Sequence, residues 1–109
     1  MDNLVSTYIY EIKKGSKLLA LVTLLEQDVD CAIEKIKKAG FSHCTQKIEG
    51  KVNLFFGEKC CIDIISTFKD KDLCNLTPQE DFILGIMLGY SREKQCHRYL
   101  NRLDLCPIG

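Results

Sequence analysis

The segment from Thr77 to Leu88, TPQEDFILGIML, restricts the fold more than any other part of the sequence. Thr77 suits a helix N-cap, Pro78 suits the first helical position, and Glu80 stands where it completes a capping box. The residues that follow leave a helix almost no polar face: Phe82, Ile83, Leu84, Ile86, Met87 and Leu88. Such a helix must be buried within the domain or across a subunit contact.

Two glycines interrupt this segment. We expect Gly85 to let another backbone approach closely and Gly89 to end the helix. Ser91 then predicts the start of a final helix over residues 92–103. Its inward stripe is expected to contain Cys96, Tyr99, Leu100 and Leu103. Its outward face is expected to be basic, with Arg92, Lys94, His97, Arg98 and Arg102.

The first quarter of the chain favours a β-hairpin. Residues 4–12 alternate aromatic and β-branched side chains, which is typical of a strand. Residues 13–17 predict a turn with Gly15 at positive φ, and the apolar run 18–25 predicts a central strand covered on both faces. A helix over residues 18–27 remains an alternative, because leucine and alanine favour helices.

The middle of the chain predicts a helix, a second hairpin and another helix. Asp28 caps a helix over 28–41, in which Gly40 takes the left-handed C-terminal position and Phe41 follows as its apolar companion. Residues 43–57 predict a hairpin that turns at Glu49-Gly50. Residues 58–69 favour a helix, although the letters CCIDII alone also suit a strand, and 70–75 form a polar linker.

These elements predict a single α+β domain over residues 1–109. We expect a small antiparallel sheet of three to four strands, in two hairpins, packed against four or five helices. Basic and acidic residues number 15 each, which disfavours nucleic acid and anionic membranes as partners. The longest apolar block has eight residues and the N-terminus lacks a signal-peptide pattern, so we expect a soluble, cytoplasmic protein.

Seven cysteines are expected to be reduced thiols, most of which pack as small apolar side chains. The sharpest chemical candidate is the pair Cys96-His97, which could form an activated thiol. Adjacent helix positions point about 100° apart, which favours a buried structural Cys96 and a surface His97. Cys60-Cys61 lacks the spacing of a zinc or disulfide-exchange site, although His43 and Cys44 could join one of them after folding.

The remaining candidates also have structural interpretations. Glu80 and Asp81 could serve acid–base chemistry, but the first turn of a helix favours acidic residues. The tyrosines Tyr8, Tyr10, Tyr90 and Tyr99 could stack on a flavin or on bases, although such residues are usually core. The basic face from Arg92 to Arg102 could bind an acidic partner or be a solvated surface. We therefore assign no catalytic, cofactor-binding or metal-ligating residue.

Four blocks of the sequence resemble a small bacterial family known as a domain of unknown function. They are YIYEIKKG, GKVNLFFG, LTPQEDFILGIMLGY and QCHRYL, and the resemblance spans residues 8 to about 103. It implies a compact α+β fold and a homodimer, and members are often encoded near flavodoxin, which suggests low-potential electron transfer as a context. Cys44, Cys60, Cys61 and Cys106 lie outside these blocks.

The resulting functional prediction is a homodimeric interaction or accessory protein that is not an enzyme. The dimer is inferred from the apolar surface of residues 82–88. The alternative is a thiol- or metal-dependent redox accessory protein that works with flavodoxin. Binding of a ligand in an aromatic pocket beside the sheet is a third, weaker hypothesis.

Overall fold

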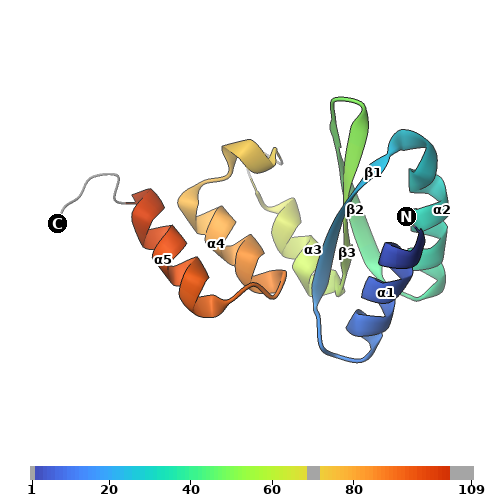
Figure 1. Cartoon of the computed structure of the whole chain (residues 1–109), viewed down its shortest axis with the longest axis horizontal. Helices are drawn as coiled ribbons and strands as arrows, with labels where there is room; N and C mark the ends of the chain where they lie inside the picture. The colour runs from blue at the N-terminus through green and yellow to red at the C-terminus, as the bar shows by residue number, and fades with distance from the viewer. Residues whose placement is uncertain (1, 69–71, 104–109) are drawn as a thin grey trace.

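The computed structural model describes residues 2–68 and 72–103 (Figure 1). The elements are α1 (Asp2–Lys13), β1 (Leu19–Leu25), α2 (Glu26–Lys38), β2 (Ser42–Ile48), β3 (Lys51–Gly57), α3 (Lys59–Ser66), the 3₁₀ turn η1 (Leu73–Asn75), α4 (Pro78–Met87) and α5 (Arg92–Leu103). The described chain is thus α+β, and its three strands and five α-helices fall within the three to four strands and four or five helices that the sequence predicts. The predicted end of α3 at residue 69 lies outside the described residues.

The sheet has the order β1-β3-β2, and β3 pairs antiparallel with both neighbours. Strands β2 and β3 form the predicted hairpin, with Leu54 opposite Thr45 on one side and Val22 of β1 on the other. The central strand is therefore β3, whose residues 52–57 are all buried. The prediction that residues 18–25 form the central strand is wrong, because β1 lies at an edge.

Helices cover the two faces of the sheet unequally (Figure 1). Helices α1 and α2 lie on one face, where Val5 and Ile36 join Leu54 and Phe56 in one apolar core. Helix α3 lies on the other face, and α4 and α5 follow it outward from the sheet. The second core joins Phe55 of β3 to α3, to Leu84 and Met87 of α4, and to Leu88, which follows α4. Helix α5 therefore packs on α4 and lies far from the sheet.

The predicted strand over residues 4–12 is wrong, since this segment is helix α1. Its buried side chains, Val5 and Ile12, are seven residues apart, and the half-buried Tyr8 and Ile9 lie between them on the same face. This is helical spacing. Gly15 does take a positive φ of 85°, but it closes the end of α1: its N–H bonds Ile12 O at 3.0 Å. The predicted first hairpin is therefore absent from the described chain.

Helix α4 begins and ends as the sequence predicts. The Glu80 N–H donates to Thr77 Oγ1, and the Thr77 N–H donates to Glu80 Oε1, each at 3.1 Å. Gly89, with φ 87°, follows the last turn, and the Tyr90 N–H donates to Gly85 O at 3.1 Å. None of the described helices has the length and apolar character needed to cross a membrane.

Candidate functional site

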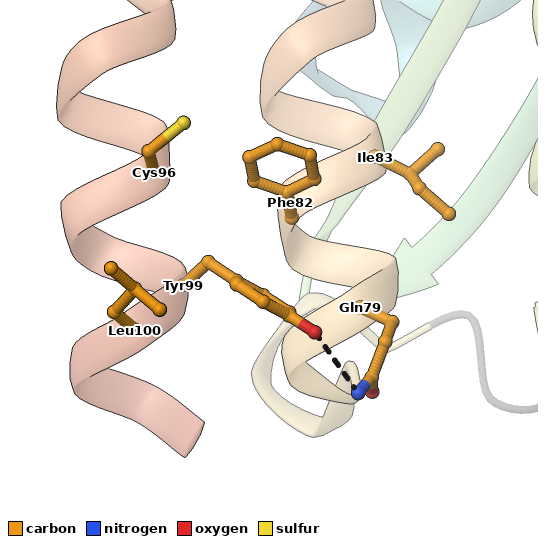
Figure 2. Close-up of a pocket in the computed structure, with 6 residues that line it drawn as sticks. All are labelled: Gln79, Phe82, Ile83, Cys96, Tyr99 and Leu100. Atoms are coloured by element: carbon orange, nitrogen blue, oxygen red, sulfur yellow. Dashed lines mark hydrogen bonds between the residues drawn. The ribbon is translucent and has the colours of Figure 1, made fainter. Parts of the chain in front are cut away.

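The most distinctive surface feature is an apolar groove on helices α4 and α5 (Figure 2). These helices follow α3 outward, at the end of the molecule away from the sheet (Figure 1). The groove encloses about 470 Å³ and is lined by six uncharged residues: Gln79, Phe82, Ile83, Cys96, Tyr99 and Leu100. We call this surface the α4–α5 groove. Because three of its residues come from each helix, it exists only when the two helices are docked together.

Aromatic contacts shape the α4–α5 groove. The rings of Phe82 and Tyr99 lie 5.3 Å apart, tilted by 52°, and Gln79 Nε2 donates to the Tyr99 hydroxyl at 3.5 Å. Figure 2 shows Tyr99 reaching across to α4, with Leu100 on α5 and Ile83 on the side of α4 away from α5. Leu100 is 57% exposed and Ile83 is 38% exposed. The groove therefore offers a broad apolar surface to a partner.

An ion pair on the other side of the two helices fixes their contact. Arg98 donates to both carboxylate oxygens of Asp81, from Nε at 2.6 Å and from Nη2 at 3.1 Å. Arg102 lies 3.7 Å from the same carboxylate and donates to Leu76 O at 2.9 Å. The hydrogen bond and the charge of Asp81 raise the pKa of the Arg98 guanidinium. Such bidentate pairs set a geometry as well as an energy.

The predicted inward stripe of the final helix is wrong at Cys96, Leu100 and Leu103, which are exposed, whereas Tyr99 is half-buried and contacts Phe82. Cys96 is exposed, and the buried residue of α5 is Gln95, its neighbour. A Cβ atom at position 85 would overlap with Gln95 Oε1, so Gly85 leaves room for this side chain. The close neighbour of Gly85 is thus a side chain and not the backbone we expected. Figure 2 shows Cys96 Sγ directed toward α4, at the edge of the α4–α5 groove.

The prediction that most cysteines are buried is also wrong for the described residues. Only Cys61 is buried; Cys44 is intermediate, and Cys31, Cys60, Cys74 and Cys96 are exposed free thiols. Cys106 lies outside the described residues. Burial, followed by the charge and hydrogen bonding of Cys60 and the charge of Glu58, raises the pKa of Cys61 to about 11. Cys61 is therefore a poor nucleophile at neutral pH.

The structure does not bring His43 and Cys44 to one site. Cys44 is paired with Phe55 and His43 with Phe56, so their side chains leave opposite faces of the sheet. Cys44 packs against the core that contains Cys61, on the α3 side. In residues 2–68 and 72–103, no three His, Cys, Asp or Glu side chains cluster closely enough to hold a metal ion.

The basic face of α5 is partly neutralised within the chain. Arg98 and Arg102 face Asp81, while His97 Nε2 lies 3.8 Å from Glu93 Oε2, one turn away. Arg92 and Lys94 are exposed. Among the acidic candidates, Glu80 completes the capping box and Asp81 binds the arginines, so both have structural partners.

The four tyrosines are not gathered into one site. Tyr8 and Tyr10 lie on α1, where Lys17 Nζ is 4.9 Å from the first ring and Lys14 Nζ is 5.1 Å from the second. Tyr90 lies between α4 and α5 and is 55% exposed. Tyr99 lines the α4–α5 groove. Gln79, which donates to Tyr99, and Gln95, which fills the space beside Gly85, carried no signal in the sequence.

Comparison with known proteins gives one family. A family model described as "Protein of unknown function (DUF2023)" matches residues 3–102. No curated protein matches the chain.

Proposed function

On the premise that the chain belongs to the DUF2023 family of proteins of unknown function, we propose that it is an interaction module that pairs with a second copy of itself. The contact would be the α4–α5 groove. The observation that carries this proposal is the groove's uncharged lining, with Leu100 57% exposed at its surface. Exposed apolar patches of this kind mark interaction sites.

The exposed apolar residues that support the dimer proposal differ in part from those that the sequence indicated. Leu84, Met87 and Leu88, from the segment that first suggested a dimer, are buried within the chain. The exposed apolar side chains come instead from both helices, including Ile83, Leu100 and Leu103. Two copies of an uncharged surface can meet without charge repulsion, and a two-fold axis would place one α4–α5 pair on another.

The size of the surface predicts a weak dimer. Helix α4 has 10 residues and α5 has 12, so they are about 15 and 18 Å long. With their axes 8–10 Å apart and each helix about 10–12 Å wide, the two helices present a flat face of about 350 Å². A standard interface buries about 800 Å² per partner. We therefore expect dissociation in the micromolar range or above.

Charge favours a second copy over an acidic protein at this surface. An acidic partner, such as a flavodoxin, needs unpaired cations on the contact. Arg98 is held by Asp81, as is Arg102 more loosely, and the lining of the groove has no charged side chain. Arg92 and Lys94, at the beginning of α5, are exposed cations that an acidic partner could contact.

Sedimentation equilibrium tests the proposal. Wild-type protein is expected to shift from its 12.4 kDa monomer toward twice that mass as its concentration rises to about 0.5 mM. Ile83→Glu and Leu100→Glu should each weaken association at least about tenfold, because a carboxylate would be buried opposite apolar side chains. Tyr10→Glu is the matched control, since Tyr10 is 62% exposed on α1.

Two outcomes would refute the dimer. One is a wild-type protein that remains monomeric over the whole concentration range. The other is a dimer that Tyr10→Glu weakens as much as Leu100→Glu. Capture of a flavodoxin by the monomer, lost on changing Arg92 and Lys94 to Glu, would instead support the partner that the family resemblance implies. Those two substitutions leave the Asp81–Arg98 pair intact.

A thiol-dependent redox role is the second candidate, and the exposure of four cysteines favours it. It predicts that one exposed thiol reacts rapidly near pH 6, where ordinary thiols are protonated. Kinetics of modification at that pH, resolved by peptide mass spectrometry, measure this directly. Uniformly slow reaction of Cys31, Cys60, Cys74 and Cys96 would exclude it.

A further inference from the structure

A second cavity of about 320 Å³ lies on the opposite side of the α4–α5 contact. Its walls include the side chains of Leu21, Leu73, Leu84 and Leu88, which come from β1, η1 and the α4 segment. Asp81 of α4, paired with Arg98 of α5, and Gln95 of α5 add polar groups to these walls. The cavity thus combines apolar surface with a few polar atoms, the usual composition of a small-molecule site.

Gln95 is the residue of this cavity whose buried side-chain amide lacks a hydrogen-bond partner in the described part of the chain. Two polar side chains are buried in the described chain, Asn53 at 6% exposure and Gln95 at 9%. Asn53 is satisfied, because it accepts from Thr23 Oγ1 at 2.8 Å and donates to Gln46 at 3.5 Å. Among residues 2–68 and 72–103, none forms a hydrogen bond with the amide of Gln95. A buried amide without a partner costs about 1–3 kcal/mol, and native proteins rarely leave one so.

The packing of α5 holds this amide in place. Gly85 provides the space that Gln95 Oε1 occupies, and the Gln95 backbone N–H donates to Ser91 O at 3.0 Å. The Asp81–Arg98 pair anchors the next turn of α5. The amide is therefore positioned before any ligand arrives, which reduces the entropy cost of binding.

The chemistry of the amide indicates what it would recognise. A glutamine side chain presents a donor and an acceptor side by side, which matches another planar group with an acceptor and a donor. An anion would gain little here, because the Nε and Nη2 atoms of Arg98 already bind Asp81. The leucine side chains suit an apolar body. We propose that this cavity binds a neutral small molecule that carries a carboxamide or lactam group on an apolar body.

Titration of the isotopically labelled full chain with benzamide and with benzoate tests the proposal. The two probes share a ring and differ in the amide and the charge. Benzamide is expected to shift the Gln95 side-chain NH₂ signal and the methyl signals of Leu84 and Leu88 along a saturating curve. Benzoate should bind at least about tenfold more weakly, since it cannot donate a hydrogen bond to Gln95 Oε1.

Gln95→Met is the decisive variant, because methionine keeps the length of the side chain and removes the amide. It should weaken benzamide at least about fivefold, the effect of losing paired hydrogen bonds. Gln79→Met is the matched control in the α4–α5 groove and should leave benzamide binding unchanged. The cavity and the groove lie on opposite sides of the helix pair, so this result is independent of the dimer.

Three results would overturn the proposal. The first is the absence of benzamide shifts at Gln95, Leu84 and Leu88 up to the solubility limit. The second is equal benzamide affinity in wild type and Gln95→Met. The third is stronger binding of benzoate than of benzamide, which would identify an anion site at Arg98. The comparison of the two probes on wild-type protein decides the question even if Gln95→Met fails to fold.

Discussion

Thr77 shows how one side chain fixes the start of a helix. Its hydroxyl accepts from the Glu80 N–H, and its own N–H donates to Glu80 Oε1. Thr77→Ala removes the first of these bonds, so we expect the free energy of unfolding to fall by about 1 kcal/mol. Urea unfolding followed by circular dichroism measures this change. Thr77→Ser keeps a hydroxyl and should lose much less; an equal loss would show that the hydroxyl is not the cause.

The contribution of Cys61 to the stability of the fold should fall at alkaline pH. Its pKa in the folded protein is raised to about 11, chiefly by burial, from an ordinary value near 9.0. The unfolded chain therefore loses this proton at a lower pH than the folded chain. The contribution of the protonated thiol to stability is complete below about pH 9 and is lost as the pH rises toward 11.

Labelling with iodoacetamide tests the burial that raises this pKa, because only an accessible thiolate reacts. At pH 8 Cys61 should react much more slowly than its neighbour Cys60, because Cys61 is buried and Cys60 is exposed. In urea the rates at the two positions should become similar. Rapid labelling of Cys61 in the folded protein would mean that the thiol is accessible and that its raised pKa is not sustained.

The identity of the buried residue on α5 could not be predicted from the sequence. Hydrophobicity placed Cys96 inward, yet Gln95 is buried and Cys96 is exposed. The reason lies in the contact between α4 and α5. Gly85 leaves a space opposite Gln95, and Asp81 draws Arg98 to the same side of α5. Such a pairing depends on how two helices meet, and neither helix carries that information alone.

At the scale of elements, short segments with two periodicities are the hardest to predict. In α1, the alternation of Tyr8, Tyr10 and Ile12 suits a strand, while Val5, Ile9 and Ile12 suit a helix. Packing against α2 and the sheet selects the helix. The helix ends predicted at Gly40 and Thr77 are confirmed, whereas the N-cap predicted at Asp28 is wrong, because α2 begins at Glu26 and Asp28 lies in its first turn. At the Gly40 end, the Phe41 N–H donates to Ile36 O at 3.2 Å.

The contact between α4 and α5 predicts strong coupling between positions 85 and 95. Gly85→Ala should gain up to about 1 kcal/mol of helix propensity, but its Cβ would displace the Gln95 amide, which we expect to cost about 1–3 kcal/mol because that side chain is buried. The net effect is destabilising. In a Gln95→Ala background the overlap is gone, and the same substitution should be neutral or stabilising.

A double-mutant cycle measured by chemical denaturation quantifies this coupling. The coupling energy between Gly85→Ala and Gln95→Ala should exceed about 1 kcal/mol. Gly85→Ala combined with Gln79→Ala provides the control, because Gln79 lies on the other side of α4. Additive effects at positions 85 and 95 would show that the two residues do not constrain each other.

Across the whole molecule, the burial of side chains decreases from the sheet outward. Strand β3 is buried over residues 52–57, α4 adds Leu84 and Met87 to the core, and α5 buries only Gln95. The sequence predicted the class of fold and the helical pair at the C-terminal side. It could not predict the α4–α5 groove, because the groove depends on the rotation of α5 about its own axis.

This gradient predicts the order in which the protein opens. Amide protons of α5 should exchange through local opening of low free energy, whereas those of β3 should exchange near the global free energy of unfolding.

If α5 also forms the dimer contact, raising the protein concentration from well below to well above the dissociation constant should slow exchange in α5 by more than in α1. Association stabilises the folded state by mass action, and the stabilisation is largest where local opening breaks the interface. Hydrogen exchange with mass spectrometry at two concentrations measures both effects, with Leu100→Glu as the variant that should abolish the second and retain the first. Equal protection of α5 and β3 would contradict the gradient, and a concentration effect that survives in Leu100→Glu would place the interface elsewhere.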